Sequence, residues 1–168
     1  MQIRELAGSD YLESKFYVNN PDCILCQGDI FGLAGPIPVI DEDGEAVAID
    51  DVEYWMAIGN TCDFARSLDT VKWTQMVPVL DLGDASELSS DDLRKLRSFQ
   101  PYRSFYVPYW KPEMQGRVLC ADFTRPVAVH KQAVQNVAKL EARLSQKAWL
   151  LFHSCLIRFL ARDDGRYD

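Results

Sequence analysis

Short apolar segments that end at glycine, proline or acidic turns are the feature of this sequence that most limits its fold. They recur between residues 24 and 129, separated by turn signals such as Asp41–Glu45. Many short strands joined by turns favour antiparallel pairing, because parallel strands need long crossover connections. Strands are predicted over residues 24–33, 52–59, 71–80, 102–107 and 118–129, the last being one strand or two interrupted at Arg125-Pro126.

A helix is predicted between two of these strands, over residues 88–99. Ser89 and Asp92 form a capping-box pattern at its start, and apolar residues then recur every three positions. Acidic residues fall in its first turn and basic residues later, as the helix dipole prefers. The pattern therefore predicts a single helix inserted into the β region.

The C-terminal part of the chain has helical periodicity. A first helix is predicted over residues 132–144, and Ser145 is a suitable N-cap for a second one with an apolar stripe. The resulting prediction is a single domain over residues 1–168, mainly β with α. A small antiparallel barrel covers about residues 23–129, and a helical segment covers about residues 131–162.

Composition excludes several classes of protein. The chain has 168 residues and a formal net charge of −7, which argues against strong non-specific binding to nucleic acid. It contains no apolar run of roughly 18 residues, so no membrane span is predicted. Its first residues do not resemble a signal peptide, and a cytoplasmic location is expected.

Five cysteines are present, and an odd number argues against a disulfide framework. Cys23 and Cys26 form a CxxC pattern, for which small apolar side chains at a strand entrance, a metal site and a redox pair remain open interpretations. A structural zinc site needs four protein ligands, and no second CxxC or paired histidines follow. No metal and no cofactor are therefore predicted.

Polar side chains lie at the boundaries of two predicted strands. Asp29 begins one strand, and Thr61, Cys62 and Asp63 end another. If these strands are antiparallel neighbours, the four residues converge at one rim. Cys62 and Asp63 are the candidate catalytic residues, and Asp29 and Thr61 are candidate binding residues. The competing interpretation is that the carboxylates bond backbone amides of two separate turns.

Tyr102, Arg103 and Tyr106 form a second candidate binding group. Aromatic and cationic side chains at this spacing can stack on a nucleobase. Packing between neighbouring strands explains the same residues equally well. Both interpretations stay open from the sequence.

Four blocks, in order, resemble the PemK/MazF-like family. They are Gly28–Phe31, the apolar strand 54–58 ending at Gly59-Asn60-Thr61-Cys62-Asp63, Met76–Val79 and Gly116–Phe123, followed by a terminal helix. The motif at 59–63 is also similar to the S-Q-T-C-D motif of an uncharacterised bacterial family, from which it departs at its first two positions. The resemblance implies an SH3-like barrel and a homodimer, and in many members a ribosome-independent, RNA-cleaving toxin.

One departure from the toxin pattern bears on activity. The family has an Arg-Pro at the start of its second strand, where this chain has Asp51-Val52-Glu53. Without that arginine, a cation that stabilises the cleaving phosphate is missing. The sequence therefore predicts a domain that binds RNA, a nucleotide or a protein partner and lacks efficient ribonuclease activity. The alternatives are an active toxin-like endoribonuclease and a cysteine-dependent enzyme centred on Cys62.

Overall fold

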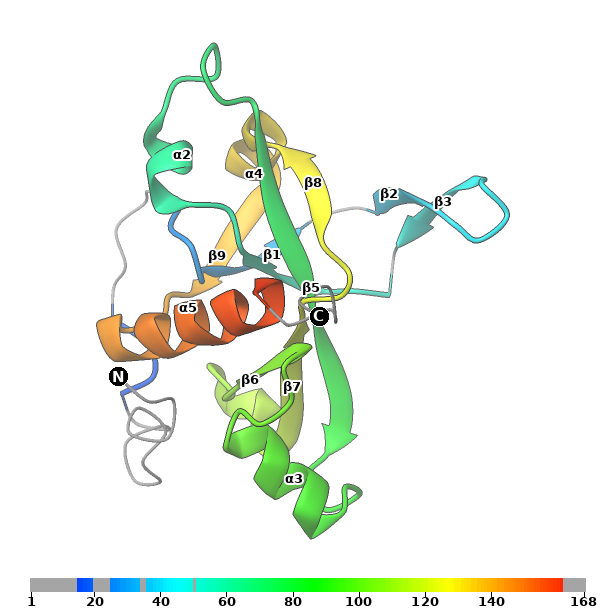
Figure 1. The fold of residues 1–168 in the computed structure, drawn as a ribbon, viewed down its shortest axis with the longest axis vertical. Coiled ribbons are helices and arrows are strands. Elements are labelled where there is room, and N and C mark those ends of the chain that lie inside the picture. The colour runs from blue at the N-terminus through cyan, green and yellow to red at the C-terminus, as the bar shows by residue number, and fades with distance from the viewer. Residues whose placement is uncertain (1–14, 20–24, 34–35, 50, 162–168) are drawn as a thin grey trace, which may run out of the picture.

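The computed structural model describes residues 15–19, 25–33, 36–49 and 51–161. Within them, a seven-stranded antiparallel sheet has the order β6-β7-β5-β4-β1-β9, and β8 also pairs with β5 (Figure 1). Its strands are β1 (Ile30–Leu33), β4 (Tyr54–Ala57), β5 (Trp73–Asp84), β6 (Ser104–Val107), β7 (Arg117–Asp122), β8 (Val127–His130) and β9 (Ala138–Ala142).

Strand β5 organises this sheet because it is long enough to pair with three neighbours. Its first half pairs with β8, its second half pairs with β7, and its middle pairs with β4. The predicted interruption at Arg125-Pro126 falls between β7 and β8, so residues 118–129 form two strands. The long green arrow of β5 crosses the molecule in Figure 1.

The predicted mainly antiparallel fold with an inserted helix and a C-terminal helix is confirmed. Barrel closure is not seen in the described residues, where the two end strands β6 and β9 do not pair with each other. The inserted helix is α3 (Ser90–Arg97), and the Ser89 side chain accepts a hydrogen bond from the Asp92 backbone N–H, as the capping pattern predicts. A short 3₁₀ helix, η1 (Pro112–Met114), precedes β7.

Helix α5 (Gln146–Leu160) packs its apolar stripe against the sheet. Ser145 caps it by accepting from the Ala148 backbone N–H. Phe152 is fully buried, and its ring lies 5.3 Å from that of Phe105 and 5.9 Å from that of Phe123. No helix in the described part of the chain is long and apolar enough to cross a membrane.

The helix predicted over residues 132–144 is wrong in its second half. Helix α4 (Lys131–Val137) ends where β9 begins. Strand β9 pairs with β1, with Phe31 opposite Leu140, and this long-range pairing overrides the local helical preference. The predicted strand over residues 24–33 is also shorter, because Gly28 has a φ of +88° and turns the chain before β1.

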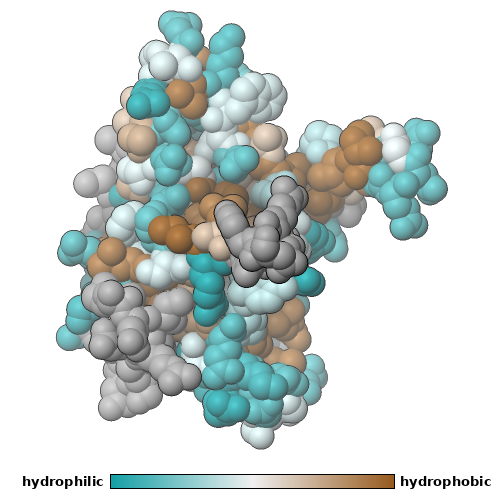
Figure 2. Space-filling model, viewed as in Figure 1, coloured by the Kyte–Doolittle hydropathy of each residue, from teal (hydrophilic) through white to brown (hydrophobic). Residues whose placement is uncertain are grey.

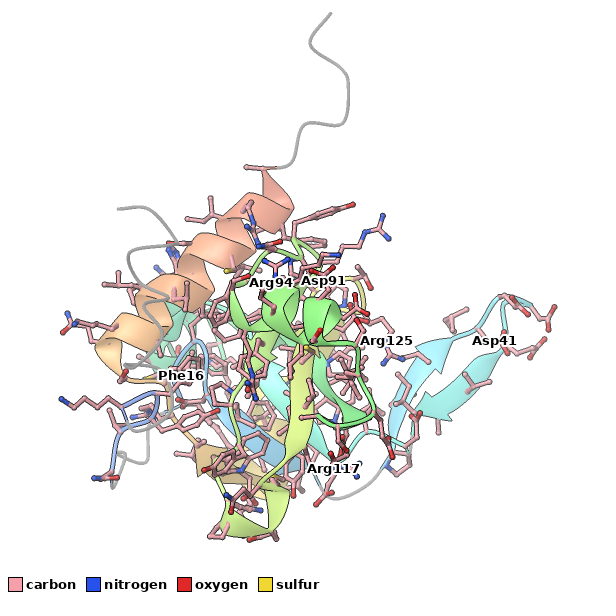
Figure 3. All side chains as sticks on the ribbon, turned by 90° about the horizontal axis from the view of Figure 1, so that it is seen from below. Phe16, Asp41, Asp91, Arg94, Arg117 and Arg125 are labelled. Atoms are coloured by element: carbon pink, nitrogen blue, oxygen red, sulfur yellow. The ribbon has the colours of Figure 1, made fainter. Side chains whose placement is uncertain are left out.

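Strands β2 (Ile37–Ile40) and β3 (Ala46–Ile49) form a separate two-stranded hairpin. The predicted acidic turn, Asp41–Glu45, is its tip. Figures 1 and 3 show this hairpin projecting from the body of the molecule, with Asp41 near its far end. Ile37 at its base is buried with Phe31 and Trp55, so the base is anchored in a core cluster.

Candidate functional site

The start of β1 lies beside the end of β4, as the sequence predicts for antiparallel neighbours. Ile30 faces Met56, and the Gly28 N–H donates to the Ala57 carbonyl at 2.8 Å. The motif that follows β4 is tied to the same turn, because the Gln27 N–H donates to Thr61 Oγ1 at 3.0 Å. The Gln27 side-chain amide also donates to the Ile58 carbonyl. Thr61 therefore holds two chain segments together.

Asp29 points into the protein rather than toward solvent. Its side chain is 0% exposed, and Arg143 donates to both carboxylate oxygens, each at 2.8 Å. The Cys26 backbone N–H donates to the same carboxylate at 2.8 Å. In this position Asp29 fixes a turn and anchors β9 to β1, which is the competing interpretation that the sequence left open.

Cys62 and Asp63 lie on a short helix, α2 (Thr61–Ala65), whereas the sequence placed them at the end of a predicted strand. Cys62 is exposed, and its thiol donates to Asp63 Oδ1 at 3.9 Å. Arg66 Nη1 donates to the same oxygen at 3.1 Å. Asp63 Oδ1 is therefore shared between the Cys62 thiol and Arg66, so the carboxylate beside the thiol is already held by a cation.

Lys131 holds the segment that carries the motif, a contact that the sequence did not predict. It is 1% exposed, and its Nζ donates to the backbone carbonyls of Asp63 and Arg66 at 2.5 and 2.7 Å. These carbonyls lie at the end of α2, where a cation is favoured and where carbonyls lack helical partners. A lysine at the start of a predicted helix gives no signal for such a contact.

A groove of about 470 Å³ opens beside the 59–63 motif. Its apolar wall includes three exposed side chains, Trp73 at 59%, Ile157 at 49% and Leu160 at 71%. Figure 2 shows hydrophobic atoms near the centre of this face, between more hydrophilic surfaces. Polar or motif residues complete the lining: Gln27, Gly59, Asn60, Asp63, Thr74, Gln75 and His153. We call this the motif groove.

Gly59 shapes the floor of the motif groove. A Cβ at this position would lie 2.4 Å from Thr74 Oγ1, a contact that real Cβ atoms do not make. Thr74 is 6% exposed, and its hydroxyl has no hydrogen-bond partner among the described residues. Only glycine fits between the motif and β5 without displacing Thr74.

The second predicted binding group does not form one surface. Its members are Tyr102, Arg103 and Tyr106. Arg103 Nε donates to the Tyr102 hydroxyl at 3.0 Å, and its guanidinium lies 5.4 Å from the Tyr102 ring centre. Tyr106 is 7% exposed and packs against Phe99 in the main core cluster. Its ring face is therefore not open to a base, whereas Tyr102 remains exposed.

A larger groove of about 840 Å³ crosses β4, β5 and β7, and its two cations are paired with carboxylates. Arg117 binds Asp81 with two nitrogens, and Lys111 Nζ lies 2.6 Å from Glu141. Burial raises the pKa of Glu141, but hydrogen bonds from Lys111 and Lys139 outweigh it and leave that pKa below its usual value. Among the described residues that line this groove, no cation is left unpaired for a phosphate.

Cys120 and Cys155 are buried thiols. Burial raises the pKa of the Cys120 thiol to about 12 and that of the Cys155 thiol to about 11. Cys26 is half-buried, and Cys23 lies outside the described residues, so the CxxC interpretations stay open. No group of three or more His, Cys, Asp or Glu in the described ranges is placed to hold a metal ion.

Comparisons with protein-family models, with curated proteins and with solved structures found no match.

Proposed function

We propose that this chain is a PemK/MazF-like domain of the SH3-like barrel type that binds a partner protein through the motif groove and lacks efficient ribonuclease activity. The order of the blocks supports the family. The Gly28–Phe31 block leads into β1, the 59–63 motif follows β4, and Met76–Val79 lies in β5. Strand β7 and the terminal helix α5 then follow in the expected order.

The observation that carries the lack of ribonuclease activity is the engagement of three cations close to the motif. Arg66 pairs with Asp63, Lys131 is buried against two carbonyls, and Arg143 binds Asp29. Cleavage of RNA needs cationic stabilisation of the pentavalent phosphate, together with an acid and a base. These three side chains already stabilise the protein's own structure instead.

The lining of the motif groove fits the side chains of a protein. Trp73, Ile157 and Leu160 supply exposed apolar area, which is the usual centre of a protein interface. Asn60 lies in the same groove, and its side chain makes no capping hydrogen bond to α2. This surface would bind an apolar side chain of a partner protein that has a polar group next to it. A second copy of the chain is one source of such a side chain.

A nucleobase is the second candidate ligand, favoured by the exposure of Trp73. Its ring meets His130 edge-on, with ring centres 5.3 Å apart, and the residue is 59% exposed. Base stacking on an aromatic side chain contributes about 1–3 kcal/mol and does not need a cation. This alternative predicts binding of single-stranded RNA or a nucleotide without cleavage.

Site-specific photo-crosslinking tests the proposal. Ile157→p-benzoylphenylalanine places the crosslinker in the motif groove, and Leu82→p-benzoylphenylalanine is the exposed control in the larger groove. We expect a defined protein product from position 157 that is absent from position 82 and is lost when Trp73→Ala is added. Products that contain RNA, or equal products from both positions, would overturn the proposed protein-binding role.

A further inference from the structure

The β2–β3 hairpin exposes apolar strands that the rest of the described structure does not cover. Each strand pairs only with the other, and the hairpin forms a sheet of its own. Ile40 is 69% exposed and Val47 is 40% exposed. Figure 2 shows a brown, hydrophobic shaft that ends in a teal, hydrophilic tip. An isolated two-stranded hairpin is marginally stable in water, so further strand pairing would stabilise it.

The two outer edges of the hairpin are not equivalent. The Asp41 N–H donates to the Glu45 carbonyl at 3.0 Å, which makes this pair hydrogen-bonded. Bonded and non-bonded pairs alternate along an antiparallel ladder, so Pro38 and Ala48, which face each other, form a non-bonded pair. Their backbone groups therefore point outward. Pro38 has no N–H, whereas β3 presents complete outward groups at Ala46 and Ala48.

The charge at the tip selects the kind of strand that can pair with β3. The turn carries four carboxylates, and none of them has an ion pair among the residues the structure describes. Cationic side chains would be attracted to this end, whereas the phosphates of RNA would be repelled. The tip residues concerned are Asp41, Glu42, Asp43 and Glu45.

Self-pairing of two hairpins would bring like charges together in either orientation. Parallel hairpins place the two acidic tips side by side. Antiparallel hairpins place each tip beside the other hairpin's base, where Asp51 and Glu53 follow β3. Like charges that face each other across strands are destabilising, and charges at strand ends are a known protection against edge-to-edge association. The hairpin therefore favours a foreign strand over a second copy.

We propose that the outer edge of β3 is a strand-addition site for an extended segment of a partner protein that carries Lys or Arg at its C-terminal end. An antiparallel partner runs from the base toward the tip, because β3 runs from Ala46 near the tip to Ile49 at the base. Its last residues then lie beside the acidic turn. Main-chain hydrogen bonds at Ala46 and Ala48 supply the pairing, as in other cases of β-augmentation. The site lies apart from the motif groove and extends the proposed function to a second surface.

A synthetic peptide tests the edge directly. The probe is a blocked peptide of sequence Thr-Val-Thr-Val-Lys-Lys, and its control has two Glu in place of the two Lys. At about millimolar peptide, amide exchange at Ala46 and Ala48 should slow about tenfold with the lysine peptide and not with the control. Unchanged exchange at both amides would overturn the proposal.

Two matched variants test whether the slower amide exchange comes from the outer edge of β3. Ala48→Pro removes an outward N–H without removing a hydrogen bond inside the hairpin, so it should abolish the protection at Ala46. Pro38→Ala, which changes the opposite edge, should leave it intact. Should Ala48→Pro unfold the hairpin, as exchange at Val39 and Val47 would reveal, Glu42→Gln with Asp43→Asn replaces it. That double variant should weaken binding of the lysine peptide about threefold and should not weaken that of the Glu peptide, which loses a like-charge repulsion.

Two further outcomes would contradict the choice of partner. Sedimentation that shows a dimer lost in Ala48→Pro would assign the edge to a second copy. Protection of Ala46 and Ala48 by oligouridylate would assign it to RNA. Leu160→Ala alters the motif groove on α5, away from the hairpin, and should leave peptide binding unchanged, so failure at the groove and failure at β3 are separate results.

Discussion

Asp29 and Asp63 flank two adjacent strands of one sheet, and the structure uses them in opposite ways. Asp29 is fully buried and bound by two nitrogens of Arg143, whereas the Asp63 side chain is 30% exposed and pairs with an exposed Arg66. The sequence presents both as acidic residues at strand boundaries. The burial of each carboxylate and the arginine that binds it therefore decide its role. Asp29 stabilises the fold, whereas Asp63 lies on a surface that can contact another molecule.

Removal of the Asp29 partner should have the largest effect. Arg143→Met leaves a buried carboxylate without its cation and should lower the free energy of unfolding by about 3–5 kcal/mol. Arg117→Met is the matched control, because Arg117 binds Asp81 with the same two-nitrogen geometry on an exposed surface. Its cost should stay below about 1 kcal/mol. Chemical denaturation measures both, and equal losses would contradict the structural role of Asp29.

The second largest loss of stability is expected at Lys131, which holds the segment that carries the motif. Lys131→Met removes the donor to the Asp63 and Arg66 carbonyls and should cost about 2 kcal/mol, because those carbonyls lose charged hydrogen bonds. The change should also increase the rate of alkylation of Cys62 by loosening α2. Lys139→Met, at an exposed position, is the control. An unchanged Cys62 rate would show that Lys131 does not hold the motif.

The contacts of Arg143 and Lys131 could not be predicted from the sequence. Strand periodicity and capping residues predicted most of β4, β5, β7, α3 and α5, because those signals are local. Arg143 and Lys131 are 114 and 68 residues from their partners, Asp29 and Asp63. No local pattern encodes such pairs. The same reason explains the missed strand β9, whose pairing with β1 is decided by the fold.

A pH-dependent contribution is expected from Glu141, which pairs with Lys111 of the larger groove. Because hydrogen bonds from Lys111 and Lys139 leave the pKa of Glu141 lowered in the folded state, it stabilises the fold above its unfolded pKa. That contribution is lost as the pH falls through the folded pKa. Glu141→Gln should cost about 1 kcal/mol at pH 7 and nothing in acid. Denaturation curves across this range would contradict the account if the difference were independent of pH.

The smallest effect on stability should come from Asp63 itself. Asp63→Asn removes an exposed ion pair with Arg66 and should change the free energy of unfolding by less than about 1 kcal/mol. Thermal unfolding provides the measurement, with wild type beside it. A loss as large as that of Arg143→Met would remove the contrast between the two carboxylates.

Incubation of a long, unstructured RNA with the purified protein tests the central claim, that the motif lacks efficient ribonuclease activity. Wild type and Asp63→Ala are compared in parallel, because Asp63 is the carboxylate that a toxin-like mechanism would use. We expect the RNA to stay intact with both proteins, since Arg66, Lys131 and Arg143 are already engaged within the protein. Efficient cleavage by wild type that is lost in Asp63→Ala would contradict the account and establish a toxin-like endoribonuclease.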